Sequence, residues 1–149
     1  MSGETFAEFK GSISILHEPS GLFGSFAFVD RDFDLLNAAD PRRGGMEYYY
    51  FNAGIVLPKL LPVGKTVFYG EYGNADGVSS VVNLGAALGG NVTSADLETY
   101  GFGFVQHVPA AELEIYTLYK NLDLDARTAT SRIASQDIDI VFSGARIKF

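Results

Sequence analysis

Two short clusters of carboxylates are the first residues whose spacing could support chemistry. Asp30, Asp32 and Asp34 alternate along the chain, so they share one face of an extended segment, and Asp123 and Asp125 do the same. Clustered carboxylates can hold Ca²⁺, but the spacing of an EF-hand, its central Gly and its closing Glu are absent. The pattern therefore favours a solvated charged rim at the ends of strands, and no metal site is expected.

The residues that could support catalysis or phosphate binding are sparse. His17 and His107 each lie beside a short turn, far apart in the sequence, and no Ser stands in a nucleophile elbow. Gly101 and Gly103 resemble a phosphate-binding loop only superficially, because the strand pattern continues through them and no helix follows. We therefore expect no catalytic residue, no enzymatic activity and no cofactor.

The composition points to strands rather than helices. The chain has 149 residues, of which 47% are hydrophobic and 19% charged, which suits one folded domain over residues 1–149. It contains 17 Gly, 12 Phe and 8 Tyr, a combination typical of strands joined by tight turns. The net charge of −7 argues against a nucleic-acid binder, which needs a basic face. The absence of Cys excludes disulfides and thiolate metal sites.

Two membrane-related signals are missing from the sequence. No stretch reaches the roughly 18–20 uncharged apolar residues that a transmembrane helix needs. The first ten residues include Glu4 and Glu8 and lack an apolar core, so they do not form a secretory signal.

Alternation with a period of two is the repeated feature of the chain, and it predicts about seven strands. In most of them, one face is aliphatic and aromatic, and the other mixes charged residues, Tyr and Gly. Most of them approach the roughly 9–11 residues of a tilted membrane strand. Residues 22–29 are apolar on both faces, so their orientation stays open. The remaining alternating segments are residues 9–15, 48–57, 66–72, 100–105, 112–120 and 141–149.

The connections alternate between short and long. Residues 17–21, 58–64 and 106–110 are short and rich in Pro or Gly, whereas residues 31–47, 74–97 and 121–137 are longer and polar. We expect residues 81–90 to form a helical turn or simply to pack over the mouth of a barrel. Short turns at one edge and long loops at the other are typical of outer-membrane barrels.

The last strand carries the most specific resemblance. Gly144-Ala145-Arg146-Ile147-Lys148-Phe149 resembles the C-terminal strand of Gram-negative outer-membrane porins, in which a terminal Phe is the signal for the barrel-assembly machinery. Three further segments and the turn region 11–23 are similar to α-proteobacterial porins, so the resemblance covers nearly the whole chain in fragments. These segments are Tyr49-Tyr50-Phe51-Asn52-Ala53-Gly54, Phe68-Tyr69-Gly70-Glu71-Tyr72 and residues 100–106.

The resemblance implies passive diffusion of small hydrophilic solutes and ions through a trimeric, water-filled pore in the bacterial outer membrane. Its apolar wall would contact outer-membrane lipid, and residues 48–51 would belong to that wall or to an aromatic girdle. Because such barrels have about sixteen strands, the chain would be the C-terminal part of a longer barrel. Phe149 would be the assembly signal. The charged residues expected to face the pore are Lys10, Glu71, Glu112, Glu114, Lys120, Arg146 and Lys148.

Two other arrangements produce the same alternation. A soluble barrel of about eight strands would place the apolar face inside and bind a small apolar ligand. A small eight-stranded membrane barrel with a structural role would require residues 1–8 to complete a further strand. The hypothesis of a pore rests on the face of Ile147, Ile115 and Phe51 contacting hydrocarbon, with Arg146 and Glu112 in water.

Overall fold

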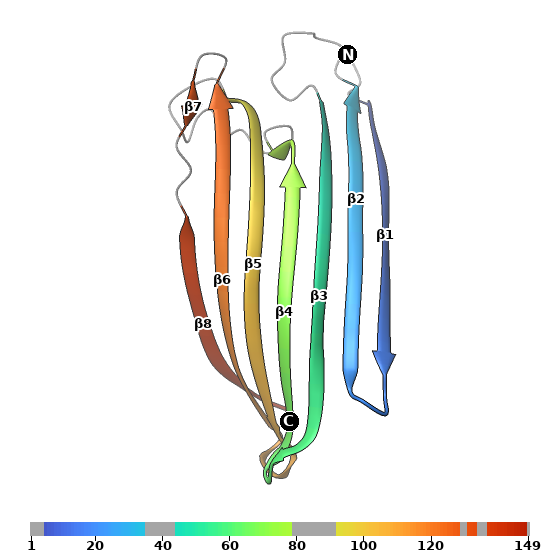
Figure 1. Ribbon diagram of the computed structural model, residues 1–149, viewed down its shortest axis with the longest axis vertical. Helices are drawn as coiled ribbons and strands as arrows, with labels where there is room; N and C mark the ends of the chain where they lie inside the picture. Colours follow the sequence, from blue (N-terminus) through green and yellow to red (C-terminus); the bar gives the residue numbers. More distant parts are fainter. Residues whose placement is uncertain (1–4, 35–43, 79–91, 129–130, 134–136, 149) are drawn as a thin grey trace.

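The computed structural model describes residues 5–34, 44–78, 92–128, 131–133 and 137–148, which form one antiparallel sheet (Figure 1). A single-turn 3₁₀ helix, η2 (Pro109–Ala111), lies between the fifth and sixth strands. The all-β, antiparallel up-and-down architecture expected from the sequence is therefore confirmed. The strands are β1 (Thr5–His17), β2 (Leu22–Asp34), β3 (Gly44–Leu61), β4 (Gly64–Asp76), β5 (Val92–Val108), β6 (Leu113–Thr128), β7 (Arg132–Ile133) and β8 (Ile138–Ile147).

Each long strand pairs with its neighbours in the sequence, from β1 to β6, and β8 pairs with the other side of β6. Among the described residues, the two-residue strand β7 pairs only with β6, at the end where β6 finishes. The turns β1–β2, β3–β4 and β5–β6 lie at one end of the sheet, which we call the short-turn end (Figure 1). The connections that follow β2, β4 and β6 start from the opposite end, which we call the long-loop end.

The first short turn shows why its sequence reverses the chain. Gly21 has a φ of +72°, a conformation that side chains other than Gly rarely adopt, and its amide donates to the carbonyl of His17 at 2.9 Å. A Cβ on Gly21 would lie 2.2 Å from the carbonyl oxygen of Val56 on β3. Gly21 therefore fixes both the turn and its close approach to the neighbouring strand.

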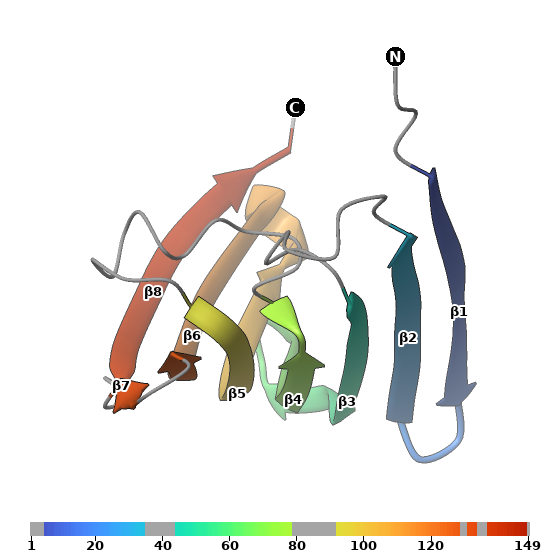
Figure 2. The same cartoon turned by 90° about the horizontal axis from the view of Figure 1, so that it is seen from above.

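The sheet is curved and open rather than closed (Figure 2). Within the described ranges, β1 pairs only with β2, and β8 only with β6. Both of these edge strands run toward the short-turn end, because an even number of strand reversals separates them.

The pairing register divides the strands into two faces. Aligned residues of antiparallel strands share a face, so one row passes through Ser25, Asn52, Glu71, Gly101 and Lys120 on strands β2 to β6. We call the face that carries this row the polar face, and the opposite one the apolar face. The register also settles the orientation of β2: Leu22, Gly24, Phe26 and Phe28 lie on the apolar face.

The exposure of these two faces is the reverse of that in a soluble protein. Phe102, Ile15 and Val141 on the apolar face are 64%, 73% and 71% exposed. The side chains of the polar face are mostly half-buried or buried on β2 to β6, as expected for the inner side of a curved sheet, where side chains converge. Among the described residues, the buried hydrophobic side chains are small: Ala75, Val92, Ala95 and Ala126.

The strands are longer than the alternation predicts, and most of the extra length lies at the long-loop end. For example, β5 begins at Val92 and β6 continues to Thr128, inside segments expected to be loops. The expected helical turn at residues 81–90 lies outside the described residues. Within the described ranges, no helix is long and apolar enough to cross a bilayer.

Candidate functional site

The centre of the polar face carries an ion pair that spans three strands. Lys120 Nζ on β6 lies 2.9 Å from Glu71 Oε1 on β4, although β5 lies between them. The residue of β5 on this row is Gly101, and a Cβ there would lie 3.2 Å from Glu71 Oε1. The glycine therefore leaves the space in which the two side chains meet.

The same glutamate also accepts a hydrogen bond from β3. Tyr50 Oη donates to Glu71 Oε2 at 2.7 Å, so the two carboxylate oxygens have different partners. The side chain of Glu71 is only 9% exposed, and that of Lys120 is 31% exposed. The carboxylate is thus held against the wall while the ammonium group reaches further into solvent.

A second carboxylate, that of Glu114, lies near the short-turn end and is surrounded by cations. Arg146 of β8 donates through both Nε and Nη2 to Glu114 Oε2, with the Nε contact at 2.9 Å. Lys148 Nζ lies 2.6 Å from Glu114 Oε1, and His107 Nδ1 of β5 lies 3.2 Å from the same oxygen. Because β5, β6 and the segment after β8 all contribute, the cluster ties the last three long strands together.

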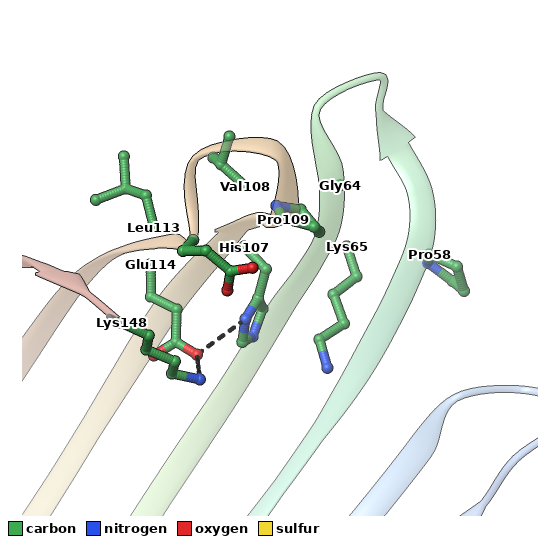
Figure 3. A pocket seen from close by; sticks show the side chains of 10 residues that line it. Pro58, Gly64, Lys65, His107, Val108, Pro109, Leu113, Glu114 and Lys148 are labelled. Atoms are coloured by element: carbon green, nitrogen blue, oxygen red, sulfur yellow. Dashed lines mark hydrogen bonds and ion pairs between the residues drawn. The ribbon is translucent and has the colours of Figure 1, made fainter.

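A hollow of about 540 Å³ opens beside this cluster (Figure 3). Figure 3 shows Lys148 and His107 directed at Glu114, with Lys65 of β4 on the same side. Lys65 has no acidic partner among the described residues. The hollow is open to solvent, and its lining includes the basic or ionisable residues Lys65, His107 and Lys148.

The third carboxylate of the polar face is Glu8 on β1. Its Oε1 forms an ion pair with Lys10 Nζ at 2.7 Å. Its Oε2 accepts two hydrogen bonds from Arg31 on β2, and the one from Nε is 2.8 Å long. Each of the three glutamates on this face therefore contacts at least one basic side chain.

The apolar face carries a wide band without a charged side chain. The described residues of this band include no Asp, Glu, Lys or Arg. The band consists of the alternate positions, counted from the first residue, of residues 9–15, 22–28, 49–57, 66–72, 100–106, 113–119 and 141–147. The band instead carries contacting aromatic rings, such as Phe68 and Phe104, whose centroids are 5.4 Å apart. This is the composition expected of a surface that contacts hydrocarbon.

The few polar groups inside the band bond to one another. Thr66 Oγ1 donates to Gln106 Oε1 at 2.7 Å, and Gln106 Nε2 donates to the backbone carbonyl of His107. Thr117 and Ser143 share a hydrogen bond of 3.1 Å between their hydroxyls. Such internal pairing removes the need for water at these positions.

Tyrosines and carboxylates mark the edge of the band at the long-loop end. Tyr72 on β4 is aligned with Tyr100 on β5. Tyr49 on β3 is aligned with Asn74, and Tyr119 on β6 is aligned with Phe102, so each lies one position of this face away from that pair. Tyr119 Oη donates to Asp139 at 2.7 Å, and Tyr49 Oη donates to Glu47 at 3.3 Å. Beyond this row the same face carries Asp30, Glu47, Asp76, Glu98 and Asp123.

The carboxylate clusters noted in the sequence belong to this rim. Asp30 and Asp32 are exposed at the end of β2, and Asp125 is bound by Arg132, with its Oδ1 3.0 Å from Arg132 Nε. Because Arg132 donates to this carboxylate, the pKa of its guanidinium is raised. In the part of the chain that the structure describes, no group of His, Asp and Glu has the geometry of a metal site.

Six of the seven charged residues predicted to face a pore lie on the polar face: Lys10, Glu71, Glu114, Lys120, Arg146 and Lys148. Glu112 does not belong to the strand on which the alternation placed it. It ends the turn after η2 with a φ of +47°, is exposed, and borders the hollow. Its position follows from the Pro109 turn, which ends two residues later than the sequence suggested. Phe149 lies outside the described residues.

The alternation did not single out three basic or ionisable residues that the structure adds to this face: Arg31, Lys65 and His107. Arg31 and His107 lie in segments that the sequence pattern assigns to connections between strands, although the alternation with a period of two continues through both residues. Extending the alternation past the most apolar positions could have found them.

No protein-family model, curated protein or solved structure matches this chain.

Proposed function

We propose that this chain forms part of the wall of a porin-like pore, through which small hydrophilic solutes and ions diffuse passively across the bacterial outer membrane. The apolar face contacts lipid, and the polar face lines water. No chemical step and no cofactor are involved. The proposal includes the partners implied by the porin resemblance: outer-membrane lipid, the barrel-assembly machinery and, for the full barrel, two further copies in a trimer.

One observation supports the proposal above all others: the more exposed face of the sheet carries the wide band without charged side chains. In water, so large an apolar surface would favour aggregation. In a bilayer the same surface is buried, and the polar groups within it, such as Thr66 and Gln106, already have partners. The tyrosine row and the acidic rim beyond it then lie at the membrane–water boundary.

The open edges of the sheet add a condition. Unpaired backbone groups on β1 and β8 are costly in lipid, so further strands must close the barrel. Because β1 and β8 run in the same direction, closure by alternating antiparallel strands requires an odd number of additional strands. This number agrees with a chain that represents the C-terminal part of a larger barrel.

The alternative of a soluble barrel that binds an apolar ligand requires the opposite arrangement. Its interior would consist of Phe51, Phe102, Ile115 and their neighbours, and its outer surface of Glu71 and Lys120. Glu71 is 9% exposed and Phe102 is 64% exposed, which favours the membrane arrangement.

Cysteine scanning along β6 tests which face meets lipid, and the natural chain has no Cys to interfere. Single variants Ile115→Cys, Tyr116→Cys, Thr117→Cys and Leu118→Cys are refolded into lipid vesicles and treated with a charged, membrane-impermeant maleimide. Positions 116 and 118 should react, and positions 115 and 117 should be protected and should contact spin-labelled lipid. A pattern with 115 and 117 reactive, or a soluble monomer that ignores the vesicles, contradicts the proposal.

Passive flux is then measured by the swelling of vesicles that contain the closed barrel, in which this chain is joined to the further strands that complete the wall. Small sugars should enter faster than large ones, without saturation. Vesicles that contain the protein heat-denatured before reconstitution serve as the control. Rates equal to those of this control would reject the pore, even if the cysteine pattern placed the sheet in the membrane.

A further inference from the structure

We infer that the polar face favours anions over cations, so that the solutes passing along it are preferentially small anions. The inference rests on the proposed function for its setting. The observation that carries it is the excess of basic side chains on this face, which the pore hypothesis alone does not predict, since a polar wall can carry either sign.

Basic groups outnumber acidic ones on this face. Among the described strand residues of the polar face and Lys148 beside them, the carboxylates are Glu8, Glu71 and Glu114. The permanently basic side chains are six: Lys10, Arg31, Lys65, Lys120, Arg146 and Lys148. With His107 neutral, the face carries three excess positive charges, or two when Glu112 at the border of the hollow is counted, although the whole chain has a net charge of −7.

The positions of the charges strengthen this excess. The side chains of Glu8, Glu71 and Glu114 are 16%, 9% and 8% exposed, because basic groups lie over them. Those of Lys10, Arg146 and Lys148 are 69%, 65% and 57% exposed. A passing ion therefore meets ammonium and guanidinium groups first, with the carboxylates behind them.

The negative charge of the chain lies elsewhere. Asp30, Glu47, Asp76, Glu98 and Asp123 continue the apolar face beyond its tyrosine row, at the long-loop end. Lys65, Arg146 and Lys148 lie at the short-turn end. Because exposed charges are screened over about 8–10 Å at physiological salt, the acidic rim does not cancel the field of the basic wall.

Ion selectivity is tested in planar bilayers by the reversal potential under a gradient of KCl. Chloride should permeate roughly 2- to 5-fold better than potassium at 0.1 M salt, and the ratio should fall toward one at 1 M, where screening is stronger. A preference for potassium, or a ratio of one at low salt, overturns the inference while leaving the pore proposal standing.

A second measurement tests the same charge excess without requiring conduction. The chain lacks Trp, and its 8 Tyr divide evenly: Tyr48, Tyr50, Tyr69 and Tyr116 lie on the polar face, and Tyr49, Tyr72, Tyr100 and Tyr119 on the apolar face. Replacing the second set with Phe leaves reporters on the polar face only. In a non-ionic detergent, iodide should quench their fluorescence more than caesium does, after each quencher is normalised to free N-acetyltyrosinamide.

Charge neutralisation completes the test. The variant Lys10→Gln, Lys65→Gln and Lys148→Gln removes the three excess charges and should bring both the quenching ratio and the permeability ratio close to one. The control Arg127→Gln and Arg132→Gln removes two positive charges outside the polar face and should change neither ratio. Equal effects of the two variants, or caesium quenching that exceeds iodide quenching in the parent, reject the inference. A quenching preference for iodide in a protein that never conducts would support the basic face and reject the pore.

Discussion

Glu71 and Lys120 form an ion pair of 2.9 Å although they belong to strands that are not neighbours, because the strand between them presents only the hydrogen of Gly101. Charged residues two strands apart are thereby joined, and the carboxylate is drawn toward the wall. The relationship explains how a glycine within a strand, which normally weakens a sheet, can have a structural use here.

The substitution Gly101→Ala should therefore destabilise the protein. A Cβ at this position meets the carbonyl oxygen of Tyr119 at 2.7 Å and Glu71 Oε1 at 3.2 Å, so we expect a loss of about 1–3 kcal/mol in the free energy of unfolding. Urea unfolding in detergent micelles, followed by circular dichroism, measures the change. The matched control is Gly70→Ala on β4, where the nearest atom lies 3.7 Å away and little change is expected. Equal losses in both variants would contradict the steric explanation.

Placing a charge on the apolar face should be costly only in a membrane. Phe102→Arg puts a guanidinium in the uncharged band, and we expect it to lose about 2–4 kcal/mol of stability in lipid. Leu118→Arg, on the polar face of the neighbouring strand, should change stability much less. Unfolding in lipid vesicles measures both. A larger loss for Leu118→Arg would mean that the polar face, rather than the apolar one, contacts hydrocarbon.

Removing the carboxylate of Glu114 should increase the preference for anions. Without this carboxylate, Arg146 and Lys148 lose their common acidic partner. Both basic side chains are exposed enough to remain solvated. In the bilayer assay, Glu114→Gln should raise the ratio of chloride to potassium permeability above that of the parent protein. Glu47→Gln, which removes one charge from the acidic rim, is the control. An unchanged ratio in Glu114→Gln would show that this cluster does not influence passing ions.

The first turn offers a test of folding that is independent of function. Gly21→Ala forces a side chain into a φ of +72° and against the carbonyl oxygen of Val56, so it should lose about 1–3 kcal/mol of stability. At Gly24, three residues later, the nearest atom to an added Cβ is 3.6 Å away, and Gly24→Ala should be tolerated. The heat-induced shift of electrophoretic mobility of the refolded protein compares the two. Similar shifts in both variants would show that the turn tolerates a side chain.

The sequence predicted the strand pattern well because a period of two needs only local information. It separated Tyr50 from Phe51 and Arg146 from Ile147 correctly, since neighbouring residues in a strand point to opposite faces. It could not orient β2, whose residues 22–29 are apolar on both faces. Pairing with β3, where Phe26 meets Phe51, supplied the missing information.

The partners of the charged residues could not be predicted in the same way. That Glu114 contacts His107, Arg146 and Lys148 depends on the register between β5, β6 and β8, which alternation alone does not fix. Glu112 was misplaced because two positions of one alternating run, Glu112 and Glu114, looked equivalent. Only the geometry of η2 shows that the strand begins between them.

The common direction of β1 and β8 also limits how copies of this sheet can combine. If two copies stand upright beside each other, β8 of one meets β1 of the next with both chains running the same way, so every junction is a parallel pair inside an otherwise antiparallel wall. Antiparallel junctions would require one copy to be inverted, which would place short turns on both sides of the bilayer. The upright ring breaks the antiparallel pairing, and the inverted ring loses the placement of all short turns on one side. In the proposed barrel, the complement of this sheet is therefore an unlike piece of wall with an odd number of strands.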